Sequence, residues 1–168
     1  QYREKDSYTS EEIKKFVEEN KDQLKREYID FKYAILNPKN LIGLEEFNQD
    51  FFDEIDKIEN KISQGDKFET ILENIKVNVI EISKYTTSST KKINEDKIYS
   101  KRSSNLDLVE NGDNFLLFSI VDKYDLGPDL SDQATKDEIT ELVFQKGKFD
   151  LNRNILEKIQ KKEFDNSK

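Results

Sequence analysis

The side chains that could do chemistry in this chain of 168 residues are carboxylates, amines, phenols and hydroxyls, because the sequence contains neither histidine nor cysteine. This inventory excludes thiol nucleophiles, disulfides, Ser-His-Asp triads, histidine general bases and ordinary zinc or haem sites. The absence of cysteine is compatible with an oxidising compartment such as a periplasm, although many cytosolic domains also lack cysteine.

Two polar segments have compositions found in binding sites, and each has a simpler interpretation. Asp50, Asp53, Glu54 and Asp56 lie close together in the sequence. They lack the Asp-x-Asp-x-Asp-Gly order of a calcium-binding loop, so we interpret them as the solvated face of a helix. Residues 86–90 are rich in hydroxyls but lack a glycine-rich turn that would hold a phosphate, and we expect an exposed loop there.

The overall composition sets further limits. The chain carries 28 basic and 36 acidic residues, a net charge of -8, and the lysines are spread among the acids. Such a surface repels phosphate backbones, which argues against a nucleic-acid partner. Hydrophobic residues make up only 34% of the chain, but 11 Phe and 7 Tyr indicate a folded domain with a thin core.

The sequence shows no apolar run near the roughly 20 residues that span a bilayer, and no signal peptide at its start. It begins with Gln1 and contains no methionine. We therefore expect it to be a region of a longer protein whose targeting segment lies elsewhere.

Apolar residues that recur every three or four positions predict the helices. A capping box formed by Thr9 and Glu12 starts the first helix, and Gly65 is expected to end the second in a left-handed conformation. A capping box from Thr135 to Glu138 is expected to start the last helix, and we expect Gly147 to break or bend it. The helices are predicted over residues 10–25, 44–64 and 66–75, and over a C-terminal stretch whose apolar stripe consists of Ile139, Leu142, Val143, Ile155, Leu156 and Ile159.

Alternating and β-branched segments predict the strands. In residues 28–36 the alternation places Ile29, Phe31, Tyr33 and Ile35 on one buried face. A second strand is expected over residues 77–85, and Ile98 with Tyr99 is expected to form a short turn. Asn111-Gly112 predicts a hairpin with a type I′ turn. Together these elements predict an α+β fold with a mainly antiparallel sheet covered by helices.

Three of these segments together resemble the parvulin-like (PpiC-type) peptidyl-prolyl isomerase domain. They are the strand "YIDFKYAIL", the helix "EEFNQDFFDEIDKIENKISQGDKFETI" and the hairpin "LDLVENGDNFLLFSIVDKY". Gly65-Asp66-Lys67-Phe68 fits the family's Gly-x-x-Phe signature. The segments on either side are similar to the helices that flank this domain in PpiD- and SurA-type periplasmic folding factors, where they build a chaperone domain. The resemblance implies flanking helices at 1–27 and 127–168 around a parvulin-like domain at 28–126.

The chain departs from the family at both catalytic histidines. The first is replaced by Ala34, or by Tyr33 if the register slips by one residue, and the second by Leu116. Active members use those histidines to organise a cleft that lowers a rotation barrier of about 18–20 kcal/mol. The resemblance therefore implies an inactive isomerase-like domain without a cofactor. Its expected peptide-binding residues are Tyr33, Ala34, Tyr99, Leu116 and Phe118.

The expected function is that of a chaperone or folding-factor domain that binds exposed apolar segments of unfolded or nascent polypeptides. The resemblance places it on the periplasmic side of the bacterial inner membrane, with a membrane anchor elsewhere in the full chain and contacts to other domains of the same protein. Two alternatives stay open. One is an active isomerase with a non-histidine site. The other is a structural protein-interaction domain, which full burial of the apolar residues of the last strand would favour.

Overall fold

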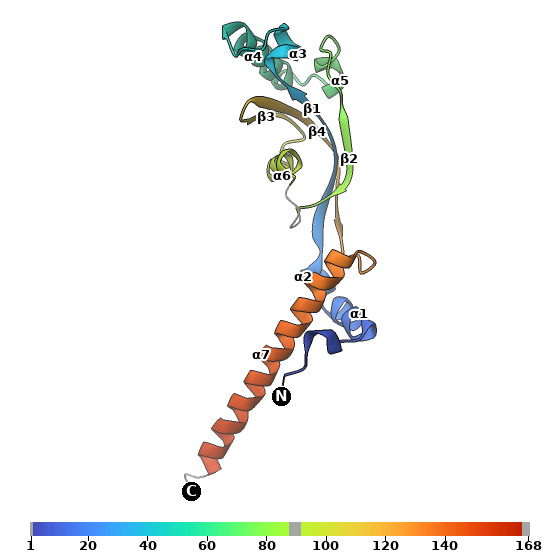
Figure 1. Cartoon of the computed structure of the whole chain (residues 1–168), viewed down its shortest axis with the longest axis vertical. Helices are drawn as coiled ribbons and strands as arrows, with labels where there is room; N and C mark the ends of the chain where they lie inside the picture. The colour runs from blue at the N-terminus through green and yellow to red at the C-terminus, as the bar shows by residue number, and fades with distance from the viewer. Residues whose placement is uncertain (1, 88–91, 166–168) are drawn as a thin grey trace. The chain divides into compact units, whose positions relative to one another are not determined.

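The structure is a computed structural model that describes residues 2–87 and 92–165. The chain divides into two compact units (Figure 1). The central unit is Glu27–Asp125, and the terminal unit combines both ends of the chain, Gln1–Arg26 with Leu126–Lys168. The two ends of the chain thus belong to one unit.

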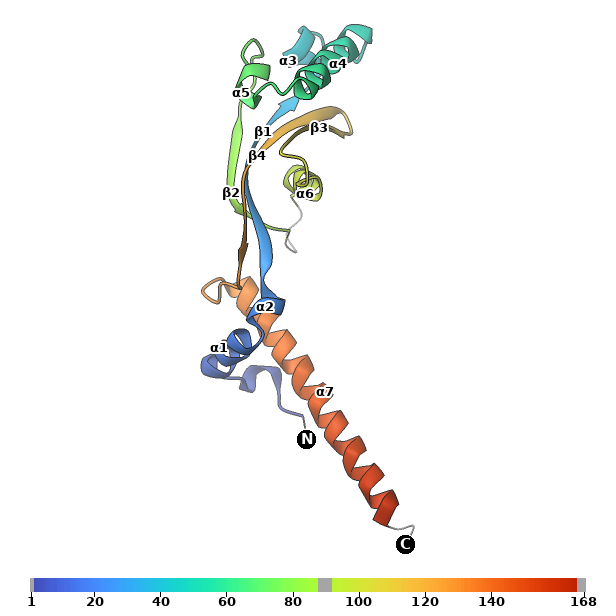
Figure 2. The same cartoon turned by 180° about the vertical axis from the view of Figure 1, so that it is seen from behind.

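The central unit is built on a four-stranded antiparallel sheet, which confirms the α+β class. Its strands are β1 (Arg26–Leu36), β2 (Ile80–Tyr85), β3 (Leu106–Asn111) and β4 (Asn114–Leu126), in the order β2-β1-β4-β3. Its helices are α3 (Pro38–Ile42), α4 (Gln49–Ser63), α5 (Phe68–Ile71) and α6 (Ile93–Ser100). In both views α6 lies beside the β3–β4 hairpin, whereas α3 and α4 lie near the end of β1 (Figures 1 and 2).

Helices cover both faces of β1. Phe31 and Tyr33 share one apolar cluster with Ile98 of α6. Ala34 and Leu36 point the other way and pack in a second cluster with residues of α4 and α5. The sequence predicted only one buried face for this strand. It missed the second because strict alternation is lost where both faces of a strand are covered.

Helix α6 replaces the short turn predicted around Ile98. Ile98 is fully buried, while Ile93 at the start of the helix is 75% exposed. A helix fixed to the sheet mainly through one buried aliphatic side chain lacks the repeated apolar positions that identify helices in a sequence. Most of the hydroxyl-rich segment before it, residues 88–91, lies outside the described residues.

The β3–β4 hairpin is confirmed, but its turn type is not. Asn111 pairs with Asn114, so Gly112 and Asp113 form a two-residue loop. Gly112 has a φ of +61°, and Asp113 is not among the described residues with positive φ. A type I′ turn needs positive φ at both central residues, whereas glycine at the first central position is typical of type II′.

Several helices and strands of the central unit are shorter than predicted. Helix α4 begins only after Asn48, whose side chain accepts a hydrogen bond from the Phe51 amide at 3.0 Å. The left-handed cap after it is confirmed, with a φ of +85° at Gly65. The third helix is only the short α5, and the second strand starts at Ile80 rather than at residue 77.

The terminal unit consists of the short 3-10 helix η1 (Lys5–Ser7) and helices α1 (Ser10–Glu19), α2 (Lys21–Leu24) and α7 (Gln133–Asp165). The capping box of Thr9 and Glu12 is confirmed. The predicted single helix over residues 10–25 is divided at Asn20, whose φ is -117°. Ile13 of α1 packs against Ile139 and Val143 of α7.

Two expectations for α7 were wrong. Asp132 lies just before the helix and accepts the Thr135 amide at 2.9 Å, so the helix starts before the predicted capping box. Helix α7 also continues through Gly147 without interruption. A Cβ on Gly147 would lie 2.5 Å from the Tyr8 hydroxyl. Glycine therefore permits a close approach of Tyr8 to the helix.

Substitution of Gly147 tests this close approach. In a Tyr8→Phe background, Gly147→Ala should stabilise the protein by about 1 kcal/mol, the difference in helix propensity between the two residues. In the native background the added methyl group meets the Tyr8 hydroxyl, and the gain should be smaller or reversed. Urea unfolding of the four proteins in this cycle measures the difference. An equal gain in both backgrounds would show that Tyr8 does not constrain this position.

Candidate functional site

The five predicted peptide-binding residues do not form one exposed surface. Tyr33, Leu116 and Phe118 belong to the cluster beneath α6 and are at most 3% exposed. Tyr99 is partly buried against the same cluster, whereas the fully buried Ala34 belongs to the cluster on the opposite face. Of the two registers considered for the first histidine position, only the one at Tyr33 shares a sheet face with Leu116.

The phenols of this cluster are held by hydrogen bonds. The Tyr33 hydroxyl donates to Glu95 at 3.0 Å, and the Tyr85 hydroxyl donates to Asp96, both acceptors being on α6. Burial, together with the hydrogen bond to Glu95, raises the pKa of Tyr33 above its usual 10.0, and burial with the bond to Asp96 raises that of Tyr85. Both phenols therefore stay protonated near neutral pH and act as hydrogen-bond donors.

A peptide would reach these sheet residues only if α6 moved away. Removal of α6 would expose Ile98, whose burial contributes about 1.5–3 kcal/mol, and would break the bonds from Tyr33 and Tyr85, each worth about 1.5–3 kcal/mol because the acceptors are charged. Peptide binding by the five residues stays a prediction. In this arrangement the surface available to a partner lies elsewhere.

The largest group of exposed apolar side chains on one helix lies on α7. Phe149 is 67% exposed and Leu156, seven residues later, is 59% exposed. With Leu142 they form one row along the helix, since seven residues make about two turns. Ile155 and Ile159 are also exposed; Ile159 lies one turn after Leu156 and beside it, whereas Ile155 lies about 100° around the helix from Leu156. We call these five residues the α7 row.

The α7 row adjoins a groove in the terminal unit, with a volume of about 310 Å³. Leu151 lines the groove, and Ile155 of the row follows one turn later. The groove walls are largely aromatic and cationic: the Arg3 guanidinium lies 4.4 Å from the Tyr8 ring centroid, and the Lys148 ammonium lies 4.2 Å from that of Phe144. The lining residues are Tyr2, Arg3, Tyr8, Phe144, Gly147, Lys148, Asp150, Leu151 and Asn154.

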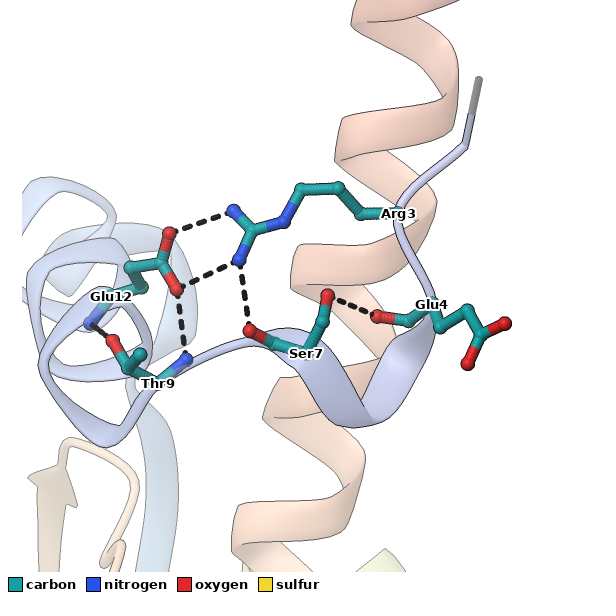
Figure 3. A network of polar contacts seen from close by, with 5 residues as sticks. All are labelled: Arg3, Glu4, Ser7, Thr9 and Glu12. Carbon is teal, nitrogen blue, oxygen red and sulfur yellow. Dashed lines mark hydrogen bonds and ion pairs between the residues drawn. The ribbon is translucent and has the colours of Figure 1, made fainter.

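The N-terminal segment that forms one wall is fixed by a polar network (Figure 3). The Arg3 guanidinium donates to both Glu12 carboxylate oxygens, at 2.7 and 3.2 Å, and to the Ser7 carbonyl at 2.9 Å. Glu12 also accepts the Thr9 amide at 2.8 Å. The same segment reaches α7 through the hydrogen bond from the Tyr2 hydroxyl to Asn152, at 2.6 Å.

This network has a clear electrostatic effect. The hydrogen bond from Arg3 and the bond from the Thr9 amide lower the pKa of Glu12 from its usual 4.5 to about 2. Glu12 therefore stays ionised in mildly acidic solution.

The groove is suited to holding apolar or aromatic side chains, because its charged groups stack on rings or pair with each other.

Two other properties bear on the site. Within residues 2–87 and 92–165, no three carboxylates are placed to hold a metal ion together. Helices long and apolar enough to cross a bilayer are likewise lacking in that part of the chain. Comparison of the chain with protein families, with curated proteins and with solved structures gives no match.

The groove and the α7 row were missed by the sequence analysis for different reasons. The pattern of Ile155, Leu156 and Ile159 was recognised as an apolar stripe, but its exposure was not predicted. An apolar stripe has the same pattern whether or not another element covers it. Only Tyr2, Arg3 and Tyr8 could have indicated the groove, and their approach to α7 depends on contacts more than a hundred residues apart in sequence.

The Arg3–Glu12 pair predicts a pH dependence. Because the pKa of Glu12 is lowered by folding, its contribution to stability is complete above about pH 4.5 and is lost as the pH falls toward 2. Glu12→Gln should therefore lower the melting temperature at pH 7, and the difference from the native protein should disappear by about pH 2. Glu11→Gln in the same helical turn is the control. A difference that persists unchanged at pH 2 would contradict this account.

Proposed function

We propose that this chain is a non-catalytic folding-factor domain that binds exposed apolar segments of unfolded or nascent polypeptides. The observation that carries the proposal is the α7 row, an apolar helix surface that no described element covers, next to an aromatic groove. Exposed apolar side chains that gather on one element are a feature of interaction sites. No cofactor takes part in the proposed binding.

The chemistry of the surface suits weak and broad recognition. Each Å² of apolar surface removed from water contributes about 25 cal/mol. A single row of helix side chains can therefore bind an extended apolar segment but cannot hold it tightly once the cost of ordering that segment is subtracted. Such binding would delay aggregation and still release the chain to fold.

The arrangement of the central unit supports a parvulin-like identity as part of this proposal. The three segments that carry the resemblance form β1, the α4–α5 pair and the β3–β4 hairpin. Gly65 of the Gly-x-x-Phe signature adopts the left-handed conformation, and Phe68 is buried. The first and last strands are neighbours in the sheet. The periplasmic location and the anchor elsewhere in the full chain rest on the resemblance.

A structural protein-interaction domain is the second candidate. Burial of Leu116, Leu117 and Phe118 favours it, because the last strand leaves no open groove beside them. In that case the α7 row would hold one folded partner rather than many unfolded ones.

An aggregation assay tests the chaperone proposal. Addition of the protein should slow the aggregation of an unfolded outer-membrane protein, as measured by light scattering. The triple variant Phe149→Ser, Leu156→Ser, Ile159→Ser should lose most of this effect, since it removes the apolar contact area of the row. The double variant Glu157→Ser, Lys161→Ser changes two exposed charged positions of the same helix away from Phe149 and Leu156 and should keep the effect.

Circular dichroism of both variants checks that α7 is still helical. Equal protection by the native protein and the apolar triple variant would exclude the α7 row as the binding surface. Lack of protection by the native protein would favour the structural alternative.

An isomerisation assay tests the absence of catalysis. The protein should not accelerate the cis-trans exchange of a proline-containing peptide, because Tyr33 is buried and donates to Glu95, and Leu116 has no polar group. Exchange is followed by a protease-coupled assay or by NMR. A rate above background that is lost in Tyr33→Phe would show that the site is active.

A further inference from the structure

A second exposed apolar surface lies in the central unit, where α4 begins. Leu44 is 51% exposed, and Phe47 and Phe52 are each 44% exposed. The rings of Phe47 and Phe52 have centroids 6.3 Å apart and form one patch. Both rings also contact Phe51, which is fully buried, with centroid distances of 5.0 and 5.4 Å. The patch is therefore fixed to the core rather than formed by loose side chains.

Four carboxylates are close to this aromatic patch in the sequence. Glu45 and Glu46 directly precede Phe47, and Asp50 and Asp56 lie two residues before and four residues after Phe52. All four are exposed. The Lys39 ammonium lies 4.0 Å from Glu45, whereas Glu46, Asp50 and Asp56 have no basic partner within the described part of the chain. This segment thus has an excess of negative charge.

We propose that this patch docks a polypeptide segment in which apolar residues are combined with lysine or arginine. The exposed faces of Phe47 and Phe52 offer apolar contact and attract cations placed over the rings. The nearby carboxylates pair with the remaining basic groups and repel acidic segments. Nucleic acids and anionic lipid surfaces are disfavoured by the same negative charge.

This surface, formed by Leu44, Phe47 and Phe52, is called the α4 patch. It is separate from the α7 row, and its test does not depend on the result for that row. The α7 row carries mixed charges on its neighbouring positions and recognises apolar character alone. The α4 patch adds a selection by charge, so its binding should weaken with salt, because exposed ion pairs are screened at high ionic strength.

Fluorescence anisotropy with three labelled peptides of equal length tests the proposal on the full chain. The first combines leucine and phenylalanine with lysine, the second replaces each lysine by glutamate, and the third keeps the lysines but replaces the apolar residues by serine. The first should bind severalfold more tightly than the other two, and its affinity should fall as the salt concentration rises. Equal binding of the lysine and glutamate peptides would overturn the proposal.

Variants locate the bound peptide. Phe47→Ser with Phe52→Ser should abolish binding of the first peptide, whereas Ile93→Ser, at a more exposed apolar position on α6, should leave it unchanged. Because the phenylalanine variants also affect packing around Phe51, the neutral variant Glu45→Gln, Glu46→Gln, Asp56→Asn provides a second test with the core intact. It should remove the preference for lysine over glutamate and the salt dependence.

The remaining control separates the two surfaces. The α7 triple variant Phe149→Ser, Leu156→Ser, Ile159→Ser should bind the first peptide as the native protein does. Loss of peptide binding in that variant, with no change in the neutral α4 variant, would place the peptide on α7 and overturn the proposal. Failure of the aggregation assay alone would leave this result unaffected.

Discussion

Strand β1 must be covered on both faces, and the arrangement of the central unit depends on this constraint. Its side chains are apolar in both directions, with Phe31 and Tyr33 on one side and Ala34 and Leu36 on the other. A sheet with two apolar faces is stable only with elements packed on each of them. Helix α6 covers one face, and α4 together with α5 covers the other. As a consequence, Tyr33, Leu116 and Phe118 are part of the core, although the resemblance to isomerases predicts that they line a peptide-binding cleft.

The terminal unit has the opposite property, since its longest helix carries more apolar surface than its neighbours cover. Ile139 and Val143 in the first half of α7 are buried against α1. The second half extends the apolar pattern over Phe149, Leu156 and Ile159 without a covering element among the described residues. Exposed apolar surface lowers solubility, and the many charged side chains of α7 offset this effect. Under our proposal, α7 therefore carries the binding of unfolded polypeptides, and the sheet has a supporting role.

Local features of the fold could be predicted from the sequence, and features that depend on distant contacts could not. The capping box of Thr9 and Glu12 and the left-handed Gly65 involve residues at most four positions apart, and both were identified correctly. The hairpin was also located, but its turn type was wrong because the first central residue is Gly112 rather than Asn111. Helix α6 was missed because Ile98 is its one buried residue, which is too few to give a helical period in the sequence. The reason for a glycine at position 147 could not be predicted either, because Tyr8, whose hydroxyl would lie 2.5 Å from a Cβ there, approaches from the other end of the chain.

The most direct test of the central claim is site-specific photocrosslinking to an unfolded polypeptide. The chain contains no cysteine, so a single introduced cysteine can carry the crosslinker without side reactions. Leu156→Cys places it on the α7 row, and Ile93→Cys places it on α6, beside the buried sheet cluster. Our account predicts efficient crosslinking from position 156 and little from position 93. Strong crosslinking from position 93 with none from position 156 would contradict it and return the binding site to the sheet.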